Sequence, residues 1–146
     1  DQVVVTPGAK PIMFYSILAL AGEGDEVIYP NPGFPIYESV IRFVGATPVP
    51  VPLTEDRGFS LDVNQLRALV TDKTKLMIVN SPQNPTGGVI PEADLKAIAE
   101  VAVEHQIPVL SDEIYSRMIY GDAFHSISAY EGMADLLIIL DGFSKT

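Results

Sequence analysis

The chain has 146 residues, enough for one domain with a sizeable core, and 47% of them are hydrophobic, which argues against disorder. Acidic residues outnumber basic residues 19 to 9, and the formal net charge of −10 should repel nucleic acid and anionic membranes. There is no cysteine, and the two histidines are far apart in the sequence, so the composition excludes disulfides and zinc–thiolate sites and predicts no metal site. These properties favour a cytoplasmic protein that acts on small molecules.

Segments typical of strands alternate with segments typical of helices in the first third of the chain. Residues 3–8 are a β-branched run that predicts a short strand ending at Pro-Gly. Residues 11–21 are apolar on nearly every face, as in a buried helix, and begin with a proline, which suits a first helical position. A strand is predicted over 26–30 and a helix over 35–45, while the prolines of 47–53 confine that extended segment to a sheet edge or a linker.

The alternation continues to the end of the chain. Residues 62–70 predict a short helix capped by its first residue, an aspartate, and 91–106 form the clearest amphipathic helix. Strands are predicted over 75–82, 107–115 and 135–142, and their apolar residues are continuous rather than alternating. Such strands are covered on both faces, and with helices between them they indicate a mainly parallel sheet. The sequence therefore predicts a three-layer α/β/α sandwich, with no apolar run long enough to cross a bilayer.

Five stretches at the predicted strand ends are rich in Gly, Pro, Asn, Asp and aromatic residues. They read TPGAK, PNPGF, NSPQNPTG, SDEIY and DGFSKT. Ligands of open α/β sheets bind at the carboxyl ends of the strands, so these stretches are where a site is expected.

The first two stretches offer an anion site and a flat surface. The backbone N–H groups of Gly8, Ala9 and Lys10 can converge on an anion at a helix N-terminus, although Pro-Gly can equally be a plain turn. Phe34 is a solitary aromatic residue in a proline-rich loop, where its ring either covers the core or lies on a flat ligand.

The next two stretches offer polar side chains. Asn84 precedes a proline, which favours an extended backbone and leaves its amide free to donate, unless the segment serves only as a turn. Asp112 follows the apolar run IPVL, and a carboxylate near the interior is costly unless it meets a cation or several donors. Tyr115 comes three residues later, within reach of the same cavity.

Lys145 follows the apolar run LLIIL at the last strand end. A phosphate-binding P-loop would need glycines one and six residues before the lysine, where this chain has Ser144 and Ile139, so that interpretation fails. A lysine amine at a strand end suits Schiff-base chemistry instead. Pyridoxal 5′-phosphate carries a phosphate, an aromatic ring with a basic nitrogen, a phenolic oxygen and an aldehyde, and the five stretches offer a partner for each of them.

In this order, PGAK, PNPGFPIY, NPTG, SDEIY and GFSKT resemble the large domain of class I/II (fold type I) pyridoxal-phosphate-dependent aminotransferases, in particular the aspartate aminotransferase-like branch. The resemblance spans essentially the whole chain. It implies that residues 1–146 are the central part of the large, catalytic domain, without an N-terminal segment and a C-terminal small domain. It also implies a homodimer with the active site at the subunit interface.

The resemblance implies catalytic roles for residues at the reactive end of the cofactor. Lys145 would be the Schiff-base lysine and the base that moves a proton on the substrate. Asp112 would keep the ring nitrogen protonated, while Asn84 and Tyr115 would hydrogen-bond the phenolic oxygen.

The resemblance implies binding roles for the remaining candidates. Phe34 would stack on the ring, and the backbone of 8–10 would bind the phosphate. Ser144 would be a further phosphate contact, although related proteins often have a hydroxyl three residues before the lysine, where this chain has Gly142.

The implied function is an aminotransferase that moves an amino group between an amino acid and a 2-oxo acid. Two alternatives stay open at this point. One is a β-lyase or a ring-forming synthase that uses the same residues, and the other is a non-catalytic module that senses the cofactor.

Overall fold

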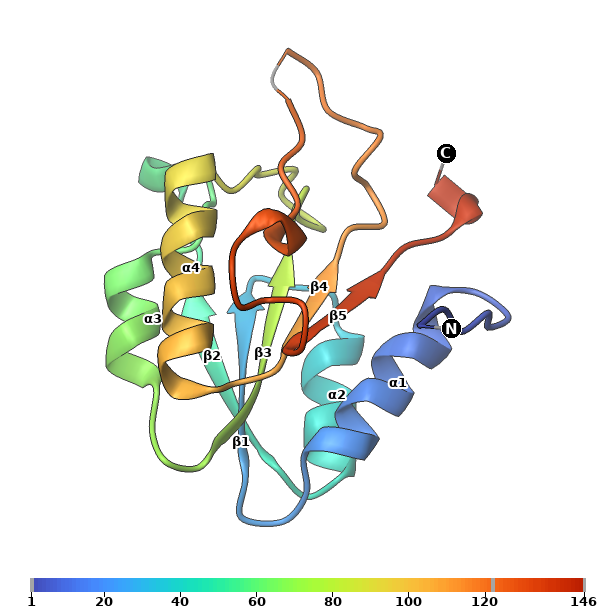
Figure 1. The fold of residues 1–146 in the computed structure, drawn as a ribbon, viewed down its shortest axis with the longest axis vertical. Helices are drawn as coiled ribbons and strands as arrows, with labels where there is room; N and C mark the ends of the chain where they lie inside the picture. The colour runs from blue at the N-terminus through green and yellow to red at the C-terminus, as the bar shows by residue number, and fades with distance from the viewer. Residues whose placement is uncertain (1, 122, 146) are drawn as a thin grey trace.

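The five strands form one parallel sheet, in the order β2-β1-β3-β4-β5. A computed structural model of the chain describes residues 2–121 and 123–145 (Figure 1). The strands are β1 (Glu26–Asn31), β2 (Thr47–Pro52), β3 (Thr74–Asn80), β4 (Val109–Asp112) and β5 (Leu137–Leu140).

Helices separate the strands along the chain. The α-helices are α1 (Ala9–Leu20), α2 (Ile36–Phe43), α3 (Val63–Leu69) and α4 (Glu92–His105). Short 3₁₀ helices are η1 (Glu55–Arg57), η2 (Ile127–Ala129) and η3 (Phe143–Lys145). None of the helices in the described part of the chain is long and apolar enough to span a membrane.

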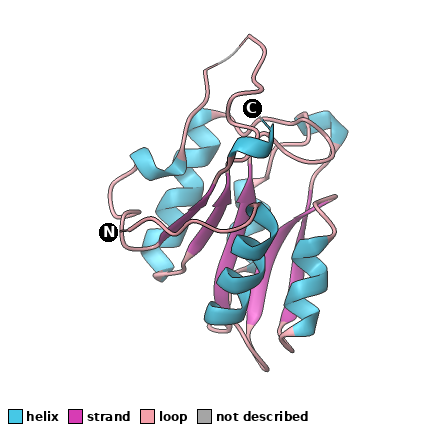
Figure 2. Cartoon of the chain, turned by 90° about the vertical axis from the view of Figure 1, so that its right-hand side faces the viewer, coloured by secondary structure: helices cyan, strands magenta, loops and turns pink. Residues whose placement is uncertain are grey.

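The helices form two layers, one on each face of the sheet (Figures 1 and 2). On one face α1 and α2 enclose a core that contains Val27 and Ile41, and on the other α3 and α4 enclose a core that contains Ile28 and Ile98. Val27 and Ile28 are neighbours in β1 and enter different cores because side chains alternate across a strand. The predicted three-layer α/β/α sandwich is therefore confirmed.

The two edges of the sheet differ in how well the sequence predicts them. The proline-rich segment 47–53 is β2 and lies at one edge, as expected for a strand whose prolines cannot donate to a ladder. At the other edge β5 is only partly covered, and 46% of the Ile139 surface is exposed. The expectation that this last strand is covered on both faces is wrong for that reason.

Two predictions near the start of the chain need correction. Residues 3–8 form no strand, because their three valines are 87%, 81% and 92% exposed and pair with no strand among the described residues. β-Branched residues favour a strand only where packing and pairing are provided. Helix α1 begins at Ala9 rather than at Pro11, which places the proline in the first turn, where an N–H would have no helical partner.

The predicted cap of α3 is confirmed, and one central strand ends earlier than predicted. The Oδ1 atom of Asp62 accepts hydrogen bonds from the N–H groups of Asn64 at 2.8 Å and Gln65 at 3.4 Å, so Asp62 caps α3 as predicted. Strand β4 ends at Asp112, earlier than predicted, and the chain turns there. Asp112 therefore lies at the carboxyl edge of the sheet.

Candidate functional site

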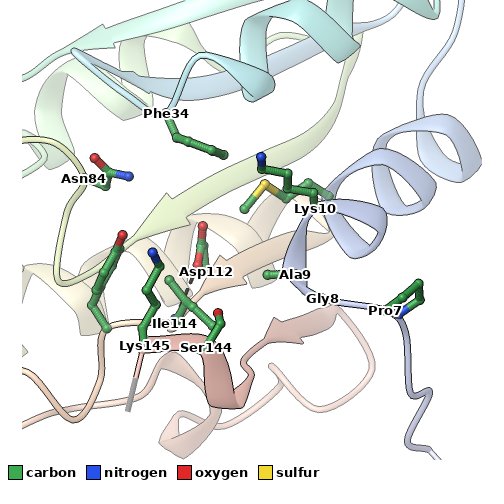
Figure 3. Close-up of a pocket in the computed structure, with 12 residues that line it drawn as sticks. Pro7, Gly8, Ala9, Lys10, Phe34, Asn84, Asp112, Ile114, Ser144 and Lys145 are labelled. Atoms are coloured by element: carbon green, nitrogen blue, oxygen red, sulfur yellow. Dashed lines mark hydrogen bonds between the residues drawn. The ribbon is translucent and has the colours of Figure 1, made fainter.

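A cavity of about 430 Å³ lies at the carboxyl edge of the sheet, beside the N-terminal end of α1 (Figure 3). All the residues that the sequence singles out line it: Gly8, Ala9, Lys10, Phe34, Asn84, Asp112, Tyr115, Ser144 and Lys145. The structure thus brings the five strand-end stretches together, while the role of each residue stays a prediction.

The topology of the sheet explains why distant segments meet in this cavity. Parallel strands deliver the loops that follow them to the same edge. Phe34 follows β1, Asn84 follows β3, Asp112 ends β4 and Lys145 follows β5. Figure 3 shows these four side chains around one central space, with the start of α1 at its side.

Asp112 is the buried carboxylate of the cavity, with 3% of its surface exposed. Its Oδ2 atom accepts a hydrogen bond from the Tyr37 hydroxyl at 2.5 Å, and its Oδ1 atom accepts one from the Ile114 N–H at 3.3 Å. Burial raises the pKa of the Asp112 carboxyl above its usual value, both hydrogen bonds oppose the rise, and the nearby Asp141 carboxylate adds to it. Asp112 thus meets several donors, as a carboxylate in the interior must.

Two cations share the cavity with this carboxylate. Lys145 lies in η3, and its Nζ atom is 6.0 Å from the centre of the Tyr115 ring, where the ring face attracts an ammonium group. Lys10 is the second cation. The wall therefore carries more positive than negative formal charge in a strongly acidic protein, which favours an anionic ligand. No group of His, Asp or Glu side chains suited to a metal ion occurs in the part of the chain that the structure describes.

The N-terminal end of α1 offers backbone donors to the cavity. None of the described side chains caps this helix, and the N–H groups of a first turn have no partner within the helix. Gly8 has a φ of 98°, in the region that favours glycine, and its own N–H donates to the Thr6 carbonyl at 2.8 Å. The Gly8 N–H is thus engaged by Thr6 in this structure, and the role of the backbone of Gly8, Ala9 and Lys10 in binding an anion stays a prediction.

A buried asparagine holds the loop that carries Asn84. Asn80 is 3% exposed at the end of β3. Its Nδ2 atom donates to the Asp112 carbonyl at 3.0 Å, and its Oδ1 atom accepts from the Asn84 N–H at 2.9 Å. Gln83 secures the same loop by donating to the Pro32 carbonyl at 2.7 Å. These contacts fix Asn84 relative to the end of β4.

Sequence reasoning missed the residues that support the site. Asn80 directly follows the apolar run LMIV and begins the stretch NSPQNPTG, which is the signal that could have identified it. Tyr37 lies on the buried face of α2, but its partner is 75 residues away, and no local pattern predicts that pairing. Three further wall residues were also missed: Pro7, Met13 and Ile114.

Comparisons with known proteins agree with this geometry. Residues 1–146 match the family model for aminotransferase class I and II. The aspartate aminotransferase of Pyrococcus abyssi is 42% identical over an alignment of 146 positions that covers 99% of this chain and 38% of that protein. The probable aspartate/prephenate aminotransferase of Aquifex aeolicus is 42% identical over an alignment of 148 positions that covers 100% of this chain and 38% of that protein. The chain therefore spans 38% of the length of these curated relatives.

The fold has a counterpart among solved structures. An aromatic aminotransferase from Pyrococcus horikoshii OT3 matches 94% of this chain with a TM-score of 0.90 and 43% sequence identity. The matched part is 37% of that structure. At this identity the likeness includes the sequence as well as the arrangement of strands and helices.

Proposed function

Since the chain belongs to the aminotransferase class I and II family, we propose that the protein containing it transfers an amino group between an amino acid and a 2-oxo acid, with pyridoxal 5′-phosphate as cofactor. One observation carries the proposal. A single cavity collects a lysine, a buried carboxylate, an aromatic ring, an amide and the uncapped start of a helix, all from separate segments.

The wall of the cavity fits the phosphate and the ring of the cofactor on which this family depends. The phosphate would lie at the N–H groups of Ala9 and Lys10, with the Lys10 ammonium and the Ser144 hydroxyl as further contacts. Phe34 would lie on the face of the ring, a contact worth about 0.5–1.5 kcal/mol beyond the buried area. The bound cofactor supplies an aldehyde that reacts with amines and a ring that withdraws electrons from the substrate Cα.

Three side chains would set the charge on the ring. Asp112, which is held by neutral donors, would supply the negative charge that favours a protonated ring nitrogen. Asn84 and Tyr115 would donate hydrogen bonds to the phenolic oxygen. Both charged ends of the ring system would then have a protein partner.

Lys145 would perform the proton transfer. As the Schiff-base lysine, it would hold the cofactor through its Nζ atom until the amino group of the substrate displaces it. Its Nζ atom would also be the base that moves the proton of the substrate Cα. The Tyr115 ring, 6.0 Å away, would hold the ammonium form of Lys145 at the cavity wall.

The described residues support the cofactor site more fully than the choice of substrate. The relatives named above are called aspartate, aspartate/prephenate and aromatic aminotransferases, so a shared segment is compatible with several amino donors. The homodimer and the cytoplasmic location implied by the resemblance remain predictions, which light scattering and cell fractionation of the full-length protein would test.

The intact mass of the full-length protein, measured before and after borohydride reduction and followed by peptide mapping, tests the proposed function. Reduction should fix one pyridoxyl group on Lys145. An amino acid added alone should then convert the bound cofactor to its pyridoxamine form. Release of pyruvate and ammonia would instead favour the lyase alternative, and the absence of any adduct would contradict the proposal.

A further inference from the structure

Tyr37 makes the shortest polar contact to the Asp112 carboxylate that the structure records. Its hydroxyl donates to the Oδ2 atom at 2.5 Å, and its side chain has no exposed surface. Tyr37 comes from α2, whereas Asp112 ends β4, so the bond crosses from the helical layer to the sheet. Tyr37 is not among the residues that line the cavity, and it therefore holds Asp112 from within the core.

The partners of Asp112 are neutral. The other oxygen, Oδ1, accepts from the Ile114 N–H, and no described lysine, arginine or histidine forms an ion pair with this carboxylate. A neutral donor stabilises the ionised form without cancelling its charge. A positively charged group that enters the cavity would therefore find an oriented carboxylate that lacks a counter-ion.

Tyr37 also contacts Phe34, the residue proposed to lie on the face of the cofactor ring. Its ring packs edge-to-face on Phe34, with 6.1 Å between the ring centres and 78° between the planes. One buried residue thus contacts the aromatic side chain proposed for the face of the cofactor ring and the carboxylate proposed for its nitrogen.

We infer that Tyr37 is a positioning residue for the cofactor chemistry: its hydroxyl orients the Asp112 carboxylate and keeps it ionised, so that Asp112 holds the ring nitrogen protonated. This inference rests on the proposed function. It is consistent with the opposing effects on Asp112, where burial raises the pKa of the carboxyl and the hydrogen bond from Tyr37 lowers it.

Tyr37→Phe in the full-length protein tests the inference, because it removes the hydroxyl and keeps the ring that packs on Phe34. Tyr29→Phe is the matched control. The Tyr29 hydroxyl also donates to a carboxylate, that of Glu38 at 2.9 Å, but neither residue lines the cavity.

The first readout is the carboxyl ¹³C titration of Asp112 in the cofactor-free protein, followed by NMR. The pKa of Asp112 should rise in Tyr37→Phe and stay unchanged in Tyr29→Phe. The other titratable groups around Asp112 are the same in both variants, so the difference between them reports the hydroxyl. These groups are Lys10, Glu113, Tyr115, Asp141 and Lys145.

The second readout is the ¹⁵N chemical shift of ring-labelled cofactor in the loaded protein. Tyr37→Phe should lose ring-nitrogen protonation at a lower pH than the wild type. Its kcat should fall roughly tenfold, as expected for a lost hydrogen bond to a charged group, with KM changed less than kcat. Replacement of Tyr37 by 3-fluorotyrosine, a stronger donor of nearly the same shape, should lower the pKa of Asp112 and serves if Tyr37→Phe fails to fold.

Each outcome decides between a positioning role and a structural one. An Asp112 titration and a ¹⁵N shift that match the wild type in the Tyr37 variants would overturn the inference and leave Tyr37 as a core residue. If the wild type itself takes up no cofactor, the proposed function fails and the inference fails with it. Uptake by the wild type together with unchanged Tyr37 variants rejects the inference alone.

Discussion

At the scale of single residues, Lys145 can be changed with little expected effect on the fold. Its side chain is exposed at the cavity wall and contacts the Tyr115 ring. Lys145→Ala should therefore leave the melting temperature of the cofactor-free protein nearly unchanged. Turnover should fall by roughly 10²–10⁴-fold or more, because the proton-transferring amine is lost.

Single-turnover kinetics and the mass after borohydride reduction measure this change. Lys96→Ala, at an exposed position of α4, is the control and should retain both adduct and turnover. A pyridoxyl adduct of normal stoichiometry on the Lys145→Ala protein would show that another amine holds the cofactor.

Asp112 is a residue at which cofactor binding and stability should conflict. Burial raises the pKa of its carboxyl, so at neutral pH the ionised form weakens the folded state relative to the unfolded chain. Asp112→Asn removes the charge and one of the two acceptors, because an amide oxygen that faces the Tyr37 hydroxyl leaves the amide nitrogen facing the Ile114 N–H. That loss does not depend on pH, so the melting temperature of the cofactor-free wild type should fall relative to that of Asp112→Asn as pH rises, while turnover of the loaded variant falls by roughly 10²-fold.

Calorimetry of the cofactor-free protein and steady-state kinetics of the loaded protein check the two halves of this prediction. A difference in melting temperature that stays constant with pH would show that the Asp112 carboxyl ionises equally easily in the folded and unfolded states. Turnover near that of the wild type would remove Asp112 from the proposed catalytic set.

At the scale of elements, the loop between β3 and α4 depends on Asn80. The side chain is buried and makes hydrogen bonds on both sides, to the Asp112 carbonyl and from the Asn84 N–H. Asn80→Ala would remove these bonds and the one to the Pro82 carbonyl, although the Asp112 carbonyl still accepts from the Ser81 N–H at 3.3 Å. The free energy of unfolding should fall by about 1–3 kcal/mol. Cofactor affinity should also fall, because Asn84 is no longer fixed.

Urea unfolding and fluorescence titration with the cofactor measure the two effects. Asn64→Ala on the exposed side of α3 is the control, and it should change neither quantity appreciably. Unchanged cofactor affinity in a destabilised Asn80→Ala protein would mean that the loop is held without Asn80.

The elements also show which parts of the fold a sequence can predict. Continuous apolar runs predicted β1, β3 and β4, because central strands of a parallel sheet must be apolar on both faces. The same reasoning failed for residues 3–8, whose strand character would need a neighbouring strand that the described residues do not provide. Local composition predicts the tendency to form a strand, and pairing decides the outcome.

At the scale of the whole molecule, the site was more predictable than its support. Phe34, Asn84 and Lys145 follow predicted strands, Asp112 lies in one, and parallel topology brings strand ends to one edge, so this part of the cavity could be assembled without coordinates. The predicted strand 3–8 does not form, so strand order does not explain the place of Gly8, Ala9 and Lys10. The bond between Tyr37 and Asp112 could not, because it depends on how α2 packs against the sheet. The engagement of the Gly8 N–H by Thr6 likewise depends on a turn whose dihedral angles the sequence does not specify.

A second buried carboxylate, that of Glu113, should make the free energy of unfolding of the whole molecule depend on pH. Glu113 is buried and accepts hydrogen bonds from the hydroxyls of Ser111 at 2.9 Å and Ser126 at 2.8 Å, which connects the end of β4 to η2. Burial raises the pKa of Glu113, these hydroxyls oppose the rise, and the carboxylates of Asp141 and Asp112 add to it.

The sign of the pH dependence follows from this raised pKa. The folded state keeps the Glu113 proton to a higher pH than the unfolded state does, so the stabilising contribution is complete below the unfolded pKa and is lost as pH rises through the folded pKa.

Glu113→Gln cannot ionise and can still accept from the serine hydroxyls through its amide oxygen. Its free energy of unfolding should therefore exceed that of the wild type at pH 7, and the difference should shrink towards pH 4. Urea unfolding of the cofactor-free protein across this range measures the difference, with Glu100→Gln at an exposed position of α4 as the control. Parallel stability profiles for the wild type and Glu113→Gln would show that Glu113 ionises equally easily in the folded and unfolded states.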